Sequence, residues 1–171
     1  MKTNGWIKLA IASLFLVFVL SCAIGQLDET QSWYEARVTS VIDGDTIKIQ
    51  FTDKIPDACE RTERVRLIGV DTPELFTEPP EFLAEEARAF SNQYYLTNIL
   101  IEFDPISARR DRYGRLLAYV YKDIGAAPLN KRLIAEGYGY YYGVFAFDPI
   151  NMSDFQAAES YARTNKKGIW K

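Results

Sequence analysis

The sequence predicts an α+β fold, a five-stranded Greek-key β-barrel of the OB type with three helices in the order βββαββαα. Two observations predict it. Apolar and polar residues alternate along short segments before any helical spacing begins, and later segments show apolar residues at helical spacing or the start and stop signals of helices. A small barrel of this kind closes on itself and leaves no sheet edge exposed.

The first three strands follow from alternation and turn sequences. EARVTSVI and IKIQF flank DGDT, residues 43–46, which is a hairpin signal. Residues 52–63 form a long polar connection. RVRLIGV, residues 64–70, then predicts a third strand with Arg64 and Arg66 on one face.

The first helix is predicted from Pro80 onward. Leu83, Ala87, Phe90 and Tyr94 recur at spacings of three or four residues, and the acids in the early turns suit the N-terminal end of a helix. Two strands, ILIEF and RLLAYVY, should then pair across a basic loop.

Two shorter helices complete the order. PLNKRLIAEG has Pro128 at its start and Gly137 at its end. SDFQAAESYAR opens with Ser153 and Gln156 in the spacing of a capping box.

The composition is that of one globular domain with a short appendage: 171 residues, of which 48% are apolar and 14% aromatic. No repeat or long linker interrupts the chain after Trp33. Cys22 and Cys59 are the only cysteines, so we expect a packed core rather than a disulfide framework to stabilise the domain.

The N-terminal segment is typical of an export signal. Lys2 and Lys8 precede an uncharged apolar run, residues 9–20, that ends at small residues. This run is shorter than the roughly 20 apolar residues that a membrane-spanning helix needs. We therefore expect a signal peptide at 1–22, a short tether at 23–34 and the folded domain at 35–171.

Two cleavage patterns are compatible with this segment. VLSC resembles a bacterial lipobox, which would make Cys22 the lipid-anchored first residue of the mature protein. AIG before Gln26 suits an ordinary signal peptidase. Both patterns predict an extracytoplasmic protein, either secreted or lipid-anchored to a membrane of the cell envelope.

The sequence contains no histidine, which excludes Ser/His and Cys/His nucleophilic catalysis and histidine-ligated zinc or iron sites. Clustered cysteine ligands are also missing from the sequence. A metal would have to be held by oxygen atoms, which is the chemistry of Ca²⁺ or Mg²⁺.

The charge balance argues against general affinity for nucleic acid. Removal of Lys2 and Lys8 with the signal peptide lowers the formal net charge from −3 to −5. Affinity for phosphate has to come from a local cluster, and ARRDRYGR, residues 108–115, supplies one. A solvated surface loop is the alternative interpretation of this run.

Two acidic motifs are candidates for chemistry. DGDT supplies Asp43 and Asp45, and DTPE supplies Asp71 and Glu74 around Pro73. Taken singly, each motif is also an ordinary turn signal.

In combination, these motifs give the chain a resemblance to the staphylococcal-type thermonuclease family over residues 35–171. VIDGDT, RLIGVDTPE, DRYGR and KKGIW occur in the family's order. The resemblance implies an OB-fold hydrolase that uses one Ca²⁺ to cleave phosphodiester bonds of DNA and RNA, leaving 3′-phosphate products.

The resemblance also implies a metal site. Asp45, Asp71 and the backbone carbonyl of Thr72 would hold the Ca²⁺, a donor set made only of oxygen. Pro73 biases the preceding residue toward an extended backbone, which could aim the Thr72 carbonyl outward.

The catalytic roles come from the same resemblance. Glu74 would activate or position the attacking water. Arg66 and Arg115 would grip the phosphate and stabilise the transition state with planar donors, and Tyr113 would contact the nucleotide. Read alone, Tyr113 could equally be a half-buried aromatic residue at the barrel rim.

The chain departs from the family pattern after Glu74, where LFTEPPEFLAEEA carries four glutamates that should repel long polyanions. The tyrosine run at 138–145 cannot be matched residue by residue. We expect a monomer that acts on single-stranded or flexible DNA and RNA. Two other functions remain open: an inactive nucleic-acid-binding module and a Ca²⁺-stabilised surface lipoprotein.

Overall fold

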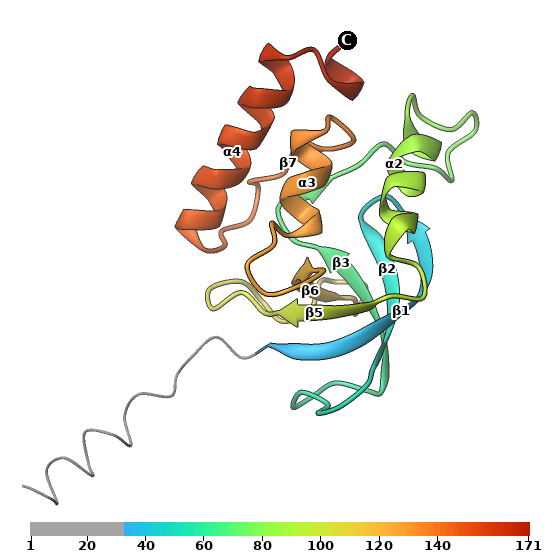
Figure 1. Ribbon diagram of the computed structural model, residues 1–171, viewed down its shortest axis with the longest axis vertical. Coiled ribbons are helices and arrows are strands. Elements are labelled where there is room, and N and C mark those ends of the chain that lie inside the picture. Colours follow the sequence, from blue (N-terminus) through green and yellow to red (C-terminus); the bar gives the residue numbers. More distant parts are fainter. Residues whose placement is uncertain (1–32) are drawn as a thin grey trace, which may run out of the picture. The chain divides into compact units, whose positions relative to one another are not determined.

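The structure is a computed structural model that describes residues 33–171 (Figure 1). The predicted signal peptide, most of the predicted tether and Cys22, the predicted alternative site of lipidation, lie outside these residues. Between residues 33 and 171 there is no helix long and apolar enough to cross a membrane.

Five strands form a closed barrel in the order β1-β2-β3-β6-β5. They are β1 (Tyr34–Asp43), β2 (Thr46–Phe51), β3 (Thr62–Leu67), β5 (Asn98–Glu102) and β6 (Leu116–Tyr121). Strands β1, β2 and β3 form an antiparallel meander, β5 pairs with β6 and with β1, and a parallel pairing of β3 with β6 closes the barrel. This confirms the predicted five-stranded barrel and its α+β class.

The alternation in β2 places every second side chain in the core. Ile47, Ile49 and Phe51 are fully buried, whereas Lys48 and Gln50 are exposed. Each large apolar side chain buried in this way contributes roughly 1.5–3 kcal/mol to stability. The period of two in the sequence therefore corresponds to one packed and one solvated face of the sheet.

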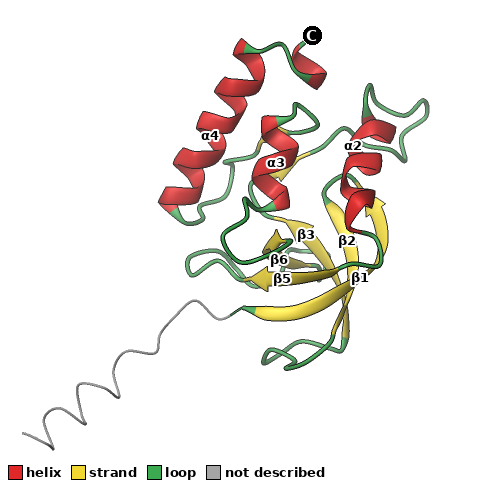
Figure 2. Ribbon diagram, viewed as in Figure 1, coloured by secondary structure: helices red, strands yellow, loops and turns green. Residues whose placement is uncertain are grey.

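Residues 33–171 form three α-helices, which gather at one end of the barrel (Figure 2). They are α2 (Ala84–Ser91), α3 (Leu129–Ala135) and α4 (Pro149–Thr164), with single 3₁₀ turns at η1 (Asn92–Tyr94) and η2 (Gly168–Trp170). Helix α3 packs on β6 and on α4, and α2 packs on β1. The predicted order of strands and helices is confirmed.

Two helix starts differ from the prediction. Helix α2 begins at Ala84 rather than near Pro80, because Leu83 has a left-handed backbone with φ of 67°. Helix α4 begins at Pro149 rather than at Ser153, because the Asp148 side chain accepts hydrogen bonds from the first free backbone N–H groups. The capping box predicted at Ser153 is therefore wrong.

A small second sheet was not predicted from the sequence. Strands β4 (Val70–Asp71) and β7 (Tyr140–Tyr141) pair antiparallel, with Asp71 opposite Tyr140. Two-residue strands are too short to show a period in sequence. This pairing fixes the backbone of Asp71 immediately after the barrel strand β3.

The buried side chain of Asn130 anchors the turn that leads into β4. Its amide nitrogen donates to the carbonyls of Ile68, at 2.9 Å, and Ala118, at 3.1 Å. Its amide oxygen accepts from the backbone N–H of Val120 at 3.2 Å. One side chain of α3 thus satisfies three buried backbone groups and holds the exit of β3 in place.

Candidate active site

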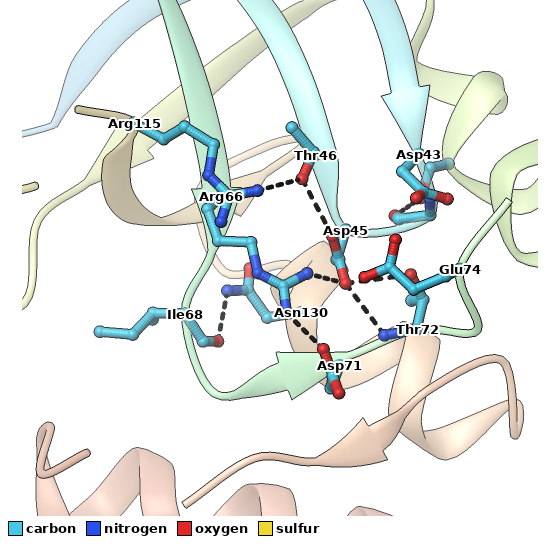
Figure 3. Close-up of polar contacts among 12 residues, drawn as sticks. Asp43, Asp45, Thr46, Arg66, Ile68, Asp71, Thr72, Glu74, Arg115 and Asn130 are labelled. Carbon is cyan, nitrogen blue, oxygen red and sulfur yellow. Dashed lines mark hydrogen bonds and ion pairs between the residues drawn. The ribbon is translucent and has the colours of Figure 1, made fainter. Parts of the chain in front are cut away.

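The turn between β1 and β2 and the segment that follows β3 meet at the rim of the barrel, below the helices. The β1–β2 turn brings Asp43 and Asp45, and the exit of β3 brings Asp71, Thr72 and Glu74 (Figure 3). The backbone N–H of Leu67 donates to the Asp45 carbonyl at 2.8 Å and so ties the turn to β3. The two acidic motifs are far apart in the sequence, and the pairing of β2 with β3 brings them together.

The carboxylate of Asp45 is the best-anchored group of the site. Its Oδ2 accepts hydrogen bonds from the backbone N–H of Thr72, at 2.9 Å, and from the Thr72 hydroxyl, at 3.0 Å. Its Oδ1 accepts from the Thr46 hydroxyl at 3.0 Å. Asp45 also forms an ion pair with Arg66. With only 4% of its surface exposed, Asp45 is a buried carboxylate compensated by four partners.

The glycine between the two aspartates is required by close packing. A Cβ on Gly44 would lie 2.7 Å from the Thr72 hydroxyl oxygen and 2.9 Å from the Cβ of Ala87. The Ser91 hydroxyl donates to the Gly44 carbonyl at 2.5 Å. Helix α2 is thus seated directly on the turn, and any side chain at position 44 would push the acids out of place.

Arg66 extends from β3 across to both metal-ligand candidates. Its Nη2 donates to Asp71 Oδ1 at 2.6 Å, and its other terminal nitrogen pairs with Asp45. Burial lowers the pKa of Arg66, and the neighbouring Asp71 carboxylate opposes that effect. An arginine stays protonated at neutral pH under such conditions, so the site holds a fixed positive charge.

Glu74 is exposed at the rim, with its side chain directed toward the β1–β2 turn (Figure 3). Partial burial of the carboxyl raises the pKa of Glu74, the nearby Asp43 carboxylate raises it further, and Arg66 opposes both effects. Asp43 is itself buried and accepts a hydrogen bond from the backbone N–H of Gly44 at 2.8 Å. No role was predicted for Asp43, although its place in Asp-Gly-Asp signalled a second acid on the same turn.

Arg115 reaches the same rim from the loop between β5 and β6. Its Nε donates to Asp111 Oδ2 at 2.7 Å, and its Nη1 lies 3.3 Å from the Thr46 hydroxyl. Thr46 on β2 pairs with Arg66 on β3. The two arginines predicted to bind phosphate, Arg66 and Arg115, therefore both lie next to Thr46. Tyr113, on the same loop, has 62% of its surface exposed, which differs from the half-buried position considered for it.

A groove of about 760 Å³ extends from this rim. Arg66, Asp71, Tyr113 and Arg115 are among the residues that line it. Aromatic residues of the tyrosine run and its neighbourhood also line it: Tyr142, Phe145 and Phe147. These residues could not be assigned to the groove from the sequence, because the run contains several aromatics with no repeating period.

The acidic segment after Glu74 closes onto the site. The backbone N–H of Glu74 donates to the Glu81 carboxylate at 3.0 Å, and the N–H of Glu81 donates to the Glu74 carbonyl at 3.1 Å. Glu78 is exposed on the same segment. The Glu81 carboxylate is therefore held beside Glu74.

The donor atoms suit a hard cation. Among residues 33–171 no group of three or more histidine, cysteine, aspartate or glutamate side chains has a metal-binding arrangement. The candidate set is therefore two carboxylates, of Asp45 and Asp71, together with the Thr72 carbonyl. Oxygen-only donors suit Ca²⁺ or Mg²⁺. The residues fit a divalent cation in both donor type and charge.

Comparison with known proteins agrees with this arrangement. The family described as Staphylococcal nuclease homologue matches residues 64–171. The chain belongs to this family. The match confirms the resemblance seen in the sequence motifs, and it includes Arg66, Asp71, Thr72, Glu74, Tyr113 and Arg115.

Individual members of the staphylococcal nuclease family are similar over most of the chain. The thermonuclease of Staphylococcus intermedius is 36% identical over 140 residues, which cover 79% of this chain and 77% of that protein. The thermonuclease of Staphylococcus hyicus is 33% identical over 139 residues, which cover 78% and 74%. Endonuclease YhcR of Bacillus subtilis (strain 168) is 32% identical over 145 residues, or 80% of this chain, but the chain spans only 11% of YhcR. The chain is thus a homologue of proteins named as nucleases.

Proposed function

We propose that this protein is an exported Ca²⁺-dependent nuclease that hydrolyses phosphodiester bonds of DNA and RNA. One observation supports this most strongly. Arg66 and Arg115 both lie next to Thr46, beside the acidic residues of the rim, and both line the groove. The similar proteins are named thermonuclease and endonuclease, which agrees with hydrolysis of phosphodiester bonds.

The two arginines would stabilise the transition state. Charge builds on the non-bridging oxygens of the phosphate during water attack, and guanidinium groups can donate to two of those oxygens at once. Ion pairs with Asp71 and Asp111 hold Arg66 and Arg115 before substrate binds. Little reorganisation is then needed as the reaction proceeds.

Glu74 would act on the water. A carboxylate with a raised pKa accepts a proton more readily than an ordinary one, so Glu74 suits the role of general base or of a positioning group for the nucleophile. Attack of that water breaks the bond to the 5′-oxygen and leaves a 3′-phosphate, as the family resemblance implies.

A Ca²⁺ would be held by Asp45, Asp71 and the backbone carbonyl of Thr72. When bound, the ion supplies positive charge that offsets the charge developing on the phosphate. Asp45 is prepared for this position by its hydrogen bonds from Thr72. The buried Asp43 lies beside the set and adds negative charge to it.

The substrate would be single-stranded or flexible DNA or RNA, bound by a monomer. Tyr113 offers an exposed ring at the groove, which suits stacking on a base. The acidic segment around Glu78 and Glu81 limits the approach of long polyanions from its side. Export, and anchoring through a lipidated Cys22, belong to the same proposal. Mass spectrometry of the mature N-terminus tests them.

The decisive assay is release of acid-soluble nucleotides from single-stranded DNA and from RNA, with Ca²⁺ and then with a chelator. We expect cleavage that stops on chelation. Glu74→Gln should abolish most of the activity while the protein stays folded, and Glu78→Gln, an exposed acid of the same segment, is the matched control.

Two results would favour the other functions. Binding of nucleic acid without cleavage would support an inactive binding module. A Ca²⁺ effect on thermal stability alone, with no binding of nucleic acid, would support a Ca²⁺-stabilised surface lipoprotein. Full activity of Glu74→Gln would overturn the catalytic assignment.

A further inference from the structure

The arginines of residues 108–115, here called the arginine loop, have different partners. The Arg109 guanidinium stacks on the ring of Phe103 at 3.6 Å, and Arg112 lies over Tyr113. Arg115 faces the rim through Asp111. Arg110 alone among them bonds to the barrel strand β3. The loop is therefore not one uniform phosphate patch.

Arg110 is bonded at both terminal nitrogens. Its Nη2 donates to Glu63 Oε1 at 2.6 Å and its Nη1 to Glu63 Oε2 at 3.0 Å, which is a two-pronged ion pair. The same nitrogens donate to the backbone carbonyls of Ala58, at 2.9 Å, and Gly114, at 2.8 Å. This pattern uses the planar fork of arginine, which lysine cannot reproduce.

Glu63 is a buried partner, with 8% of its surface exposed. Burial on its own raises the pKa of Glu63, but hydrogen bonds from Arg110 and from the backbone N–H of Glu60 outweigh burial and leave the pKa below its usual range. The carboxylate is therefore ionised at neutral pH. Removing Arg110 would leave the buried charge of Glu63 without its partner.

The polar connection at 52–63 takes part in this arrangement. Ala58 has a left-handed backbone, with φ of 59°, and its carbonyl accepts from Arg110. Glu60 contributes its N–H to Glu63. The connection, which had no assigned purpose from sequence, thus packs against the arginine loop through the Glu63–Arg110 pair.

The pair lies at the base of the loop that carries two groove residues. Arg110 bonds to the Gly114 carbonyl, and Asp111 Oδ1 accepts the backbone N–H groups of Tyr113, at 2.9 Å, and Arg115, at 3.0 Å. Asp111 Oδ2 then orients the Arg115 guanidinium. A displacement at Arg110 would pass directly to the loop tip, because these bonds join the base of the loop to its tip.

We propose that Arg110 is a positioning residue: its ion pair with Glu63 fixes the arginine loop on β3 and so holds Arg115 and Tyr113 at the groove. This inference rests on the proposed nuclease function. Arg110 also lines the groove, so direct phosphate binding by Arg110 is the competing role. Glu63 distinguishes the two, because a buried carboxylate cannot itself bind phosphate.

A double-mutant cycle tests the proposal. Glu63→Gln, Arg110→Gln and the double variant are compared for kcat and KM on a short single-stranded oligonucleotide, and for amide hydrogen exchange across residues 111–115. Lys131→Gln is the control, because it breaks the Lys131–Asp154 ion pair away from the loop. We expect each single variant to lower kcat by about tenfold or more, since small displacements of catalytic groups have effects of this size.

The double variant should be no worse than the poorer single variant, and exchange across 111–115 should accelerate in all three. Arg110→Lys keeps the positive charge but not the planar fork of donors, so it should lower kcat by less than Arg110→Gln does. It replaces the glutamine variant in the cycle if that variant fails to fold. A rise in KM for Arg110→Gln with Glu63→Gln unchanged would overturn the proposal in favour of phosphate binding. Additive losses would overturn it as well.

Failure of the proposed function is distinguishable from failure of this inference. If the unmodified protein cleaves no nucleic acid, the nuclease proposal fails while amide exchange still reports on the ion pair. Unchanged exchange across 111–115 in both single variants would then overturn the positioning role.

Discussion

Arg66 Nη2 lies 2.6 Å from Asp71 Oδ1, so a residue inside β3 is bonded to the acid just beyond the end of that strand. The same guanidinium also pairs with Asp45. Two carboxylates from different chain segments are therefore held together by one planar cation. A divalent ion and Arg66 would draw on the same oxygens, which links metal binding to the freedom of Arg66 to meet a phosphate.

Arg66→Lys should lower kcat by about a hundredfold, because lysine keeps the charge but lacks the planar fork that pairs with two acids or with two oxygens of one phosphate. Arg64→Lys is the matched control, since Arg64 is exposed on the same strand and has no part in the proposed site. Steady-state kinetics on single-stranded DNA checks the prediction. Equal activity of the two variants would remove Arg66 from the catalytic set.

Ca²⁺ should stabilise the folded protein through Asp45 and Asp71. A ligand that binds only the native state at about 100 times its Kd raises the free energy of unfolding by about 2.7 kcal/mol. Thermal unfolding with and without Ca²⁺ measures this effect without any assay of activity. Asp45→Asn and Asp71→Asn should abolish most of it, whereas Asp53→Asn, an exposed acid of the 52–63 connection, should keep it. An undiminished effect in both site variants would place the ion elsewhere.

The barrel and the order of helices could be predicted because their signals are local. Alternation in β2 needs only neighbouring residues, and Pro128 and Gly137 bracket α3 as expected. The acids of the candidate site were also visible in sequence, because their short motifs recur in a known family.

Features that depend on distant contacts could not be predicted. Helix α2 starts late because Leu83 has a left-handed backbone, and the hydrogen bonds of Asn130 in α3 to the Ile68 and Ala118 carbonyls follow no periodicity of the sequence. Glu63 and Arg110 are 47 residues apart, so a glutamate in a polar connection and an arginine in a basic loop gave no sign of being partners.

Stability should fall in acid through Asp104, a buried carboxylate outside the candidate site. It accepts from the Tyr119 hydroxyl at 2.5 Å and from the backbone N–H groups of Ile106, Ser107 and Asp148. Burial alone raises the pKa of Asp104, but these hydrogen bonds outweigh burial and leave the pKa below its usual value. Such a group stabilises the fold above its unfolded pKa of about 3.9, and that stability is lost as pH falls through the folded pKa.

Urea unfolding between pH 7 and pH 3 checks this prediction. Asp104→Asn should lose about 2 kcal/mol at pH 7, the scale of hydrogen bonds to a charged group, and should show a shallower decline in acid. Asp123→Asn, an exposed acid, should follow the unmodified protein. Parallel curves for Asp104→Asn and the unmodified protein would contradict the assignment.

Tyr113 should contribute to substrate binding through its ring rather than its hydroxyl. The hydroxyl already accepts from Arg112 Nη2 at 2.7 Å, while the ring is exposed at the groove. Base–aromatic stacking is worth about 1–3 kcal/mol, so Tyr113→Ala should raise KM about tenfold or more with little change in kcat. Tyr113→Phe should keep most of the affinity. Tyr95→Ala, an exposed tyrosine outside the groove, is the control, and an equal rise in KM for Tyr113→Phe and Tyr113→Ala would show that the hydroxyl carries the interaction.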